Sequence, residues 1–203
     1  MVPSVNSHSR LAAQWDKQDV PLVVLDLASV ETYFLVQPLS CLAFEQEGAV
    51  WCPLISDPAP LDRDEPGARA RADALQLELQ WPARHPQPVP RAMRVAALAC
   101  DHGRGADFML GMSRLAWGSG RDLDDPGEYE FLAAEIGLDK REAGEAAQEG
   151  SAYDRRLSDV AGRLKRLGIA TAPALRWQRQ IYAGSRSIAL VLAESRSAQP
   201  RSN

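Results

Sequence analysis

The sequence predicts an α/β protein in which one sheet domain is interrupted by an all-helical insertion. Strand-like segments lie towards the two ends of the 203-residue chain. The segments between them have the apolar spacing and the capping residues of helices. The order is strand, helix, strand, then a block of helices, then two strands and a helix. A single sheet built from both ends of the chain is the simplest arrangement with this order.

The chain is organised around residues 20–34, VPLVVLDLASVETYF. Residues 20–27 form a nearly continuous apolar run, which is typical of a parallel strand covered on both faces. The polar residues Ser29 and Thr32 follow, and such side chains can cap the next helix. In open α/β sheets, ligands bind at the carboxyl ends of strands, next to helix N-termini. We therefore expect any functional site to lie near Ser29.

An apolar, helix-like segment follows at residues 33–47, and Pro38 interrupts it. Because a proline inside a helix costs about 3 kcal/mol or more, two arrangements are open. Either the helix is kinked at Pro38, or residues 29–37 form a loop and the helix starts at the proline. Gly48 can end the helix, and residues 50–54 then indicate a second strand, which completes a βαβ unit.

Residues 55–67 are rich in proline and aspartate and indicate a loop. Helices are expected beyond it, at residues 68–75, 90–102, 107–117, 128–136, 140–148 and 152–167, with an extended connector at residues 82–90. The strongest start signal is DPGE at residues 125–128. It combines an aspartate cap, a proline at the first helical position and a glutamate in the first turn.

Two strands return at residues 174–177 and 180–183, and Gln178-Arg179 between them suits a hairpin turn. A short helix is expected at residues 185–194. The predicted domains are a thioredoxin-like sheet domain at residues 19–67 and 168–195, a helical insertion at residues 68–167 and a loosely ordered arm at residues 1–18.

Composition restricts the functional class. A net charge of −4 and a pI near 5.4 argue against nucleic acid as the main partner. Apolar runs stay short of the ~20 residues that span a bilayer, and the N-terminus lacks the pattern of a secretion signal, so we expect a cytoplasmic protein. The cysteines at positions 41, 52 and 100 form no Cys-x-x-Cys pair and have no nearby histidine at metal-ligand spacing, so we expect no metal site.

βαβ followed by ββα is the order of the thioredoxin fold, and a helical block between the halves gives its DsbA-like variant. Over residues 20–191 the chain resembles the 2-hydroxychromene-2-carboxylate isomerase family, kin to the kappa-class glutathione transferases. Four matches carry this resemblance. DLASVET at residues 26–32 resembles the family's Asp-x-x-Ser-Pro-Tyr-Ser run, and residues 81–94 resemble its Trp-Pro and proline-rich segment before an Arg/Ala-rich helix. GIATAP at residues 168–173 resembles the family's Gly-Val-x-x-Val-Pro run. GSR at residues 184–186 partly matches its Gly-x-Asp-Arg run.

The resemblance implies a glutathione-dependent isomerase or transferase. In its reaction, the glutathione thiolate adds reversibly to a small aromatic or unsaturated carbonyl substrate. It makes Ser29 the catalytic residue, because a hydroxyl donating at a helix N-terminus favours the thiolate. The simpler alternative is that Ser29 only caps a helix. Relatives are commonly dimers, so a homodimer is also implied.

Four further residues are expected to hold glutathione on the strength of the resemblance. Pro173 would follow a cis peptide bond, and the backbone of Ala172 would then pair with glutathione beside Ser29. Ser185 and Arg186 open the last helix and would hold the γ-glutamyl end. The simpler alternatives are an ordinary strand-entry proline and a serine that only caps its helix.

Other residues near these positions leave alternatives open. Arg69 and Arg71 could reach a carboxylate from the insertion, although most such arginines are solvated. Val30 and Glu31 replace the family's Pro-Tyr. Glu31 would oppose a thiolate at Ser29, or it points to solvent. These departures favour a second class of function, a non-catalytic thioredoxin-fold binding protein. A third class, a disulfide oxidoreductase, is disfavoured because disulfide exchange needs a reactive thiolate and a resolving thiol.

Overall fold

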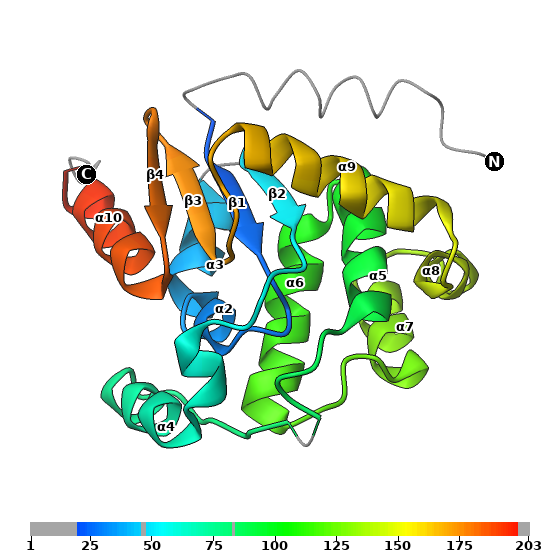
Figure 1. The fold of residues 1–203 in the computed structure, drawn as a ribbon, viewed down its shortest axis with the longest axis horizontal. Coiled ribbons are helices and arrows are strands. Elements are labelled where there is room, and N and C mark those ends of the chain that lie inside the picture. The colour runs from blue at the N-terminus through cyan, green and yellow to red at the C-terminus, as the bar shows by residue number, and fades with distance from the viewer. Residues whose placement is uncertain (1–19, 46–47, 83, 199–203) are drawn as a thin grey trace.

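The computed structural model describes residues 20–45, 48–82 and 84–198. The arm predicted at residues 1–18 lies outside them. Four strands form one mixed sheet in the order β2-β1-β3-β4 (Figure 1). They are β1 (Leu22–Leu25), β2 (Val50–Pro53), β3 (Ala174–Trp177) and β4 (Gln180–Ala183). β1 runs parallel to β2 and antiparallel to β3. The prediction of one sheet built from both ends of the chain is therefore confirmed.

The helices fall close to the predicted positions. They are α2 (Val30–Tyr33), α3 (Val36–Glu45), α4 (Glu65–Ala74), α5 (Pro90–Asp101), α6 (Gly105–Ser113), α7 (Pro126–Glu135), α8 (Lys140–Ala147), α9 (Ala152–Arg166) and α10 (Ser185–Ala198), with a 3-10 turn η1 (Pro60–Arg63) and a π-helical turn η2 (Arg114–Gly118). α4 begins earlier than predicted because Asp64 caps it, accepting from the N–H of Gly67 at 3.1 Å. α10 is longer than the helix predicted at residues 185–194.

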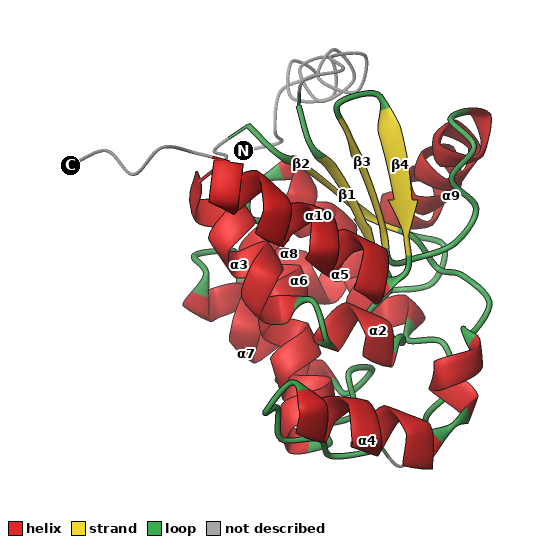
Figure 2. Ribbon diagram, turned by 90° about the vertical axis from the view of Figure 1, so that its left-hand side faces the viewer, coloured by secondary structure: helices red, strands yellow, loops and turns green. Residues whose placement is uncertain are grey.

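β1 separates two layers of side chains. Leu22 and Val24 pack with Leu164 of α9 on one face of the sheet. Val23 and Leu25 belong to the larger core on the other face, which α3 and α10 cover (Figure 2). This alternation follows from the period-2 geometry of a strand, and it explains why the predicted strand reads as continuously apolar. The regular strand is shorter than residues 20–27 because the chain turns directly after it.

Pro38 lies in the first turn of α3, and neither expected arrangement is fully right. The chain makes the single turn α2, breaks, and starts α3 at Val36, two residues before the proline. N–H groups in a first helical turn have no partner within the helix, so a proline there removes no hydrogen bond. Because α2 starts directly after Ser29, a helix N-terminus remains at the predicted site.

The hairpin between β3 and β4 has the predicted bounds and turn. Gln178 and Arg179 have φ angles of 49° and 67°. Positive φ at both central residues is the mark of the type I′ turn, which matches the twist of the flanking strands. The pairing of Trp177 with Gln180 closes the hairpin.

Helices α5, α6, α7 and α8 form a block beside β2, and the largely buried α5 contacts α6, α8 and α9 (Figure 1). Within the described part of the chain, residues 92–167 contain no strand, as predicted. No helix among the described residues has the length and apolar character needed to cross a membrane.

Candidate functional site

Ser29 lies where β1 ends and α2 begins, and it is buried. Its side chain does not cap α2. The hydroxyl instead donates to Oδ1 of Asp62 at 3.2 Å, and the N–H of Val30 donates to the same oxygen at 2.7 Å. The expectation that the Ser29 hydroxyl caps the helix was therefore wrong, because the carboxylate of Asp62 caps it from η1.

Asp62 is a site residue that the sequence did not single out. It is one of three aspartates at residues 55–67, and nothing in the local pattern separates it from the other two. Its carboxylate is buried, and its second oxygen accepts from the N–H of Ala59 at 2.9 Å. Burial raises the pKa of Asp62, while the hydrogen bonds from Val30, Ala59 and Ser29 oppose that rise. The carboxylate of Asp62 therefore binds a proton more readily than an exposed aspartate does.

Asp26 is a second buried carboxylate at the end of β1. It accepts from the N–H of Ala28 at 2.9 Å, and from the N–H and hydroxyl of Ser56 at 2.8 and 3.1 Å. Burial raises the pKa of Asp26 to about 6, and the nearby charge of Asp62 adds to the rise. Perturbed carboxylates of this kind are typical of functional sites, although structural networks also produce them.

Pro173 follows a cis peptide bond, as predicted. The antiparallel register pairs Val24 with Ala174, so Pro173 enters β3 at the end of β1 that leads to Ser29. The carbonyl of Pro173 accepts from the N–H of Gly184 at 3.0 Å, which fixes the start of α10 at the same edge of the sheet. Contact of one ligand with both Ser29 and Ala172 stays a prediction.

Ser185 opens α10, as predicted, but the chain itself supplies a carboxylate there. The N–H and the hydroxyl of Ser185 donate to Oε2 of Glu31 at 2.7 and 2.9 Å. The expectation that Glu31 points to solvent was therefore wrong. Its side chain ties α2 to α10, which are far apart in the sequence.

The two candidate arginines of the insertion differ in their surroundings. Arg69 is bound to Glu65 and to the carbonyl of Leu79. The guanidinium of Arg71 lies 5.2 Å from the centre of the Phe34 ring. Burial lowers the pKa of Arg71, and the nearby carboxylate of Glu31 partly restores it. Of the two arginines, Arg71 is thus the one whose charge interacts with Glu31.

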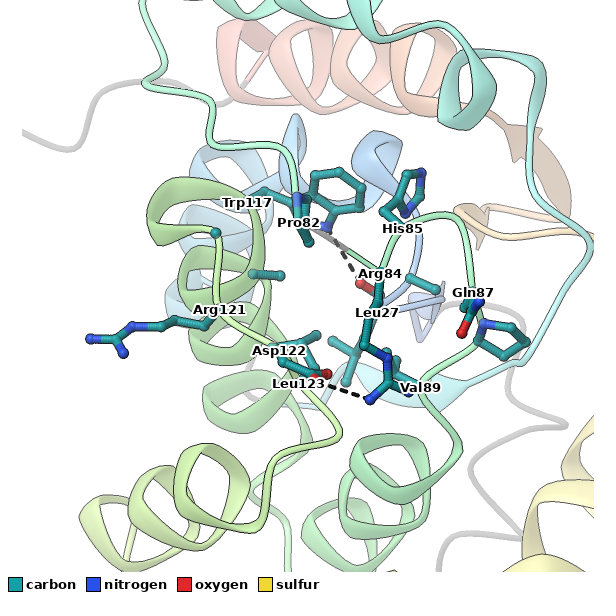
Figure 3. Close-up of a pocket in the computed structure, with 14 residues that line it drawn as sticks. Leu27, Pro82, Arg84, His85, Gln87, Val89, Trp117, Arg121, Asp122 and Leu123 are labelled. Atoms are coloured by element: carbon teal, nitrogen blue, oxygen red, sulfur yellow. Dashed lines mark hydrogen bonds and ion pairs between the residues drawn. The ribbon is translucent and has the colours of Figure 1, made fainter.

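A cavity of about 120 Å³ opens beside the residues that precede Ser29 (Figure 3). Its walls include Leu27, Ala28, His85, Val89, Trp117 and Leu123. The indole N–H of Trp117 donates to the carbonyl of Leu27 at 3.3 Å. An apolar cavity of about 150 Å³ binds benzene, so this one suits a single aromatic ring.

His85 connects this cavity to Asp62. Its Nε2 lies 2.6 Å from the backbone carbonyl oxygen of Asp62. Because a carbonyl only accepts, Nε2 carries the hydrogen, and Nδ1 of the neutral ring is an acceptor. Burial lowers the pKa of His85, which favours this neutral form. The ring also packs against Trp117, with centroids 4.5 Å apart.

The cysteines lie away from the start of α2. Cys41 is in α3, Cys52 in β2 and Cys100 in α5. Burial raises the pKa of Cys100 to about 12 and raises that of Cys52 as well. Thiols with raised pKa values are largely protonated at neutral pH, and only the thiolate attacks a disulfide. This geometry disfavours disulfide exchange.

No protein-family model matches the sequence, and no curated protein matches it. The chain is similar to several solved structures, three of which are described here. A 2-hydroxychromene-2-carboxylate isomerase has a TM-score of 0.70 and 15% identity, covering 88% of this chain and 95% of its own. A probable DsbA oxidoreductase from Streptomyces coelicolor has a TM-score of 0.63 and 16% identity, and the match covers 90% of this chain and 92% of that protein. The cytosolic disulfide reductase DsbM from Pseudomonas aeruginosa, with GSH, has a TM-score of 0.59 and 19% identity, and the match covers 89% of this chain and 100% of that protein.

The protein has the DsbA-like thioredoxin fold. Its site fits glutathione only in part. Ser29 offers a hydroxyl to a thiol, and Ala172 precedes the cis bond that the resemblance requires. At α10, however, the carboxylate of Glu31 already holds the two donors of Ser185. A second carboxylate at that position needs Glu31 to move.

Proposed function

We propose that the protein is a glutathione-dependent isomerase or transferase that acts on a small aromatic or unsaturated carbonyl compound. The observation that carries the proposal is the aromatic-walled cavity beside Leu27 and Ala28, directly before Ser29. The similarity of the fold to that of 2-hydroxychromene-2-carboxylate isomerase adds support. The proposal includes the cytoplasmic homodimer that composition and resemblance imply.

Glutathione would supply a thiolate that adds reversibly to the unsaturated substrate. On the protein side, Ser29 accepts the thiol proton at Oγ while it passes its own proton to Asp62. The hydrogen bond between Ser29 and Asp62 already has the direction needed for this transfer. The raised pKa of Asp62 makes its carboxylate a better proton acceptor than an exposed aspartate.

The cavity gives the substrate its orientation in this proposal. Its apolar wall at Val89 and Leu123 receives a ring, and Trp117 packs against it. Nδ1 of His85 can accept a hydrogen bond from a hydroxyl of the substrate, because Nε2 is committed to Asp62.

The Ser29→Ala variant is expected to remain folded and to lose most of its turnover. It gives up one buried hydrogen bond, which costs about 1 kcal/mol, while Asp62 still caps α2 through Val30. Loss of a positioned proton-transfer group lowers turnover by about 100-fold or more. Turnover of an enone substrate with glutathione measures this, with Ser197→Ala, at an exposed hydroxyl of α10, as the control. Equal turnover in wild type and Ser29→Ala would reduce Ser29 to a structural residue.

A non-catalytic binding protein is the second candidate. Its support is that the donors at the start of α2, the Ser29 hydroxyl and the Val30 N–H, are already bound to Asp62. The two candidates differ in a thermal-shift titration with glutathione. A ligand at a hundred times its Kd stabilises the folded state by about 2.7 kcal/mol, which raises the Tm of a protein of this size by about 5–10 °C. No rise at 10 mM glutathione, with S-methyl-glutathione as the control for the thiol, would favour the binding protein.

A further inference from the structure

The start of α10 is an anion-binding position that the chain fills with its own carboxylate. Oε2 of Glu31 accepts from the N–H and the hydroxyl of Ser185, and Ser185 is only 1% exposed. The first N–H groups of a helix lack partners within the helix, and the helix dipole is positive there. Glu31 lies two residues after Ser29, so the same short segment carries the candidate catalytic residue and this carboxylate.

The charge of Arg71 interacts with the carboxylate of Glu31. Burial lowers the pKa of Arg71, the carboxylate of Glu31 raises it, and the charge of Arg186 lowers it. Gly184 adds no side chain at this point, and a Cβ built there would lie 3.5 Å from Oε2 of Glu31. Without Glu31, an acidic group would meet the N–H and the hydroxyl of Ser185 and the charge of Arg71. With Glu31 in place, the same acidic group would find both donors of Ser185 already bound.

We propose that Glu31 is a specificity-determining residue that weakens the binding of thiols bearing a carboxylate at this position, glutathione included, without abolishing it. This inference rests on the thiol-dependent function proposed above and deepens it. It follows from a mismatch: the residues expected to hold the γ-glutamyl end of glutathione hold Glu31 instead.

Two effects give Glu31 the advantage over an incoming carboxylate. Glu31 belongs to the same chain, so its binding costs little association entropy, whereas a ligand loses translational and rotational freedom. A second carboxylate close to Glu31 is also repelled by it, because both groups are negative at neutral pH. A neutral thiol such as N-acetylcysteamine does not compete with Glu31 for this position and is not repelled by its charge.

Calorimetric binding of two thiols to the full-length protein tests the inference. Glutathione carries the carboxylate and N-acetylcysteamine lacks it. Glu31→Ala removes the carboxylate from the start of α10. Glu31→Gln removes the charge but keeps the shape of the side chain, so it still tests the inference if Glu31→Ala does not fold. Glu65→Gln removes an exposed carboxylate of α4 that is bound to Arg69, so it matches the change in net charge.

The expected result is a glutathione Kd about tenfold lower in Glu31→Ala than in wild type, and a smaller gain in Glu31→Gln. The Kd of N-acetylcysteamine is expected to stay within about twofold, and Glu65→Gln to match wild type for both thiols. An equal change for both thiols, an unchanged glutathione Kd, or no glutathione binding in any variant would overturn the inference. Because binding is measured without turnover, a wild-type protein that shows no thiol-dependent turnover speaks only against the proposed function.

Discussion

Replacing Trp117 by alanine is expected to lower the free energy of unfolding by about 3–5 kcal/mol. The side chain is 1% exposed and lies between the cavity and the core. It packs edge-on against Trp81, with centroids 5.5 Å apart, and its N–H holds the carbonyl of Leu27. Alanine removes the ring contacts and leaves that carbonyl without its partner. Equilibrium unfolding in urea measures the loss.

Two further variants separate the contributions of Trp117. Trp117→Phe keeps an aromatic ring and loses the N–H, so its cost is expected to be smaller, about 1–2 kcal/mol. Phe131→Ala removes an aromatic ring that is 55% exposed, and it is expected to change stability by no more than about 0.5 kcal/mol. If Trp117→Ala costs as little as Phe131→Ala, the wall of the cavity is not a packed part of the core.

The same packing gives Trp117 an expected role in binding. The cavity that suits one aromatic ring has the indole as a wall, so its loss widens the cavity and removes contacts to a ring held there (Figure 3). Trp117→Phe should therefore weaken binding of an aromatic substrate more than it weakens binding of the thiol. A KM measured for each of the two reactants distinguishes these effects.

The parts of the fold that sequence could predict are those set by local pattern. A nearly continuous apolar run indicated β1, the turn at Gln178 and Arg179 indicated the hairpin, and the Asp125 cap indicated the start of α7. Pro38 was ambiguous because a proline is compatible with both a helix start and a kink. The structure resolves it with a break that begins α3 two residues earlier, which depends on how α2 packs as well as on the proline itself.

The site itself depends on contacts between distant segments, which a single sequence does not reveal. Ser29 was placed correctly because the end of a strand can be recognised locally. Its partner Asp62 lies 33 positions away, and Glu31 meets Ser185 across 154 positions. Nothing in the sequence next to Asp62 or Glu31 distinguishes these residues from acidic residues on a protein surface. Their roles become visible only once the sheet brings the end of β1 to η1 and to the start of α10.

Between pH 4 and pH 7, wild type is expected to lose about 2 kcal/mol of stability relative to the Asp26→Asn variant. Burial raises the pKa of Asp26 from 3.8 to about 6. The folded state therefore binds the proton more tightly than the unfolded state does. The stability that this proton confers is fully present below about pH 4 and is lost as the pH rises through about 6.

Comparing variants at each pH isolates this effect. Asp124 also has a raised pKa, but both proteins share it, so its contribution largely cancels in the difference. The charge of Asp62 acts on Asp26, so the difference also contains the coupling between these two carboxyls. Asparagine keeps an acceptor for Ala28 or Ser56 but cannot satisfy every donor, so a constant offset is expected at all pH values. Only the slope with pH reports the titration of Asp26. Asp57→Asn, at an exposed carboxyl, is the control for the removal of one carboxyl group. A flat difference for Asp26→Asn would mean that the buried carboxyl titrates in the ordinary range, and the end of β1 would then hold no carboxyl poised near neutral pH.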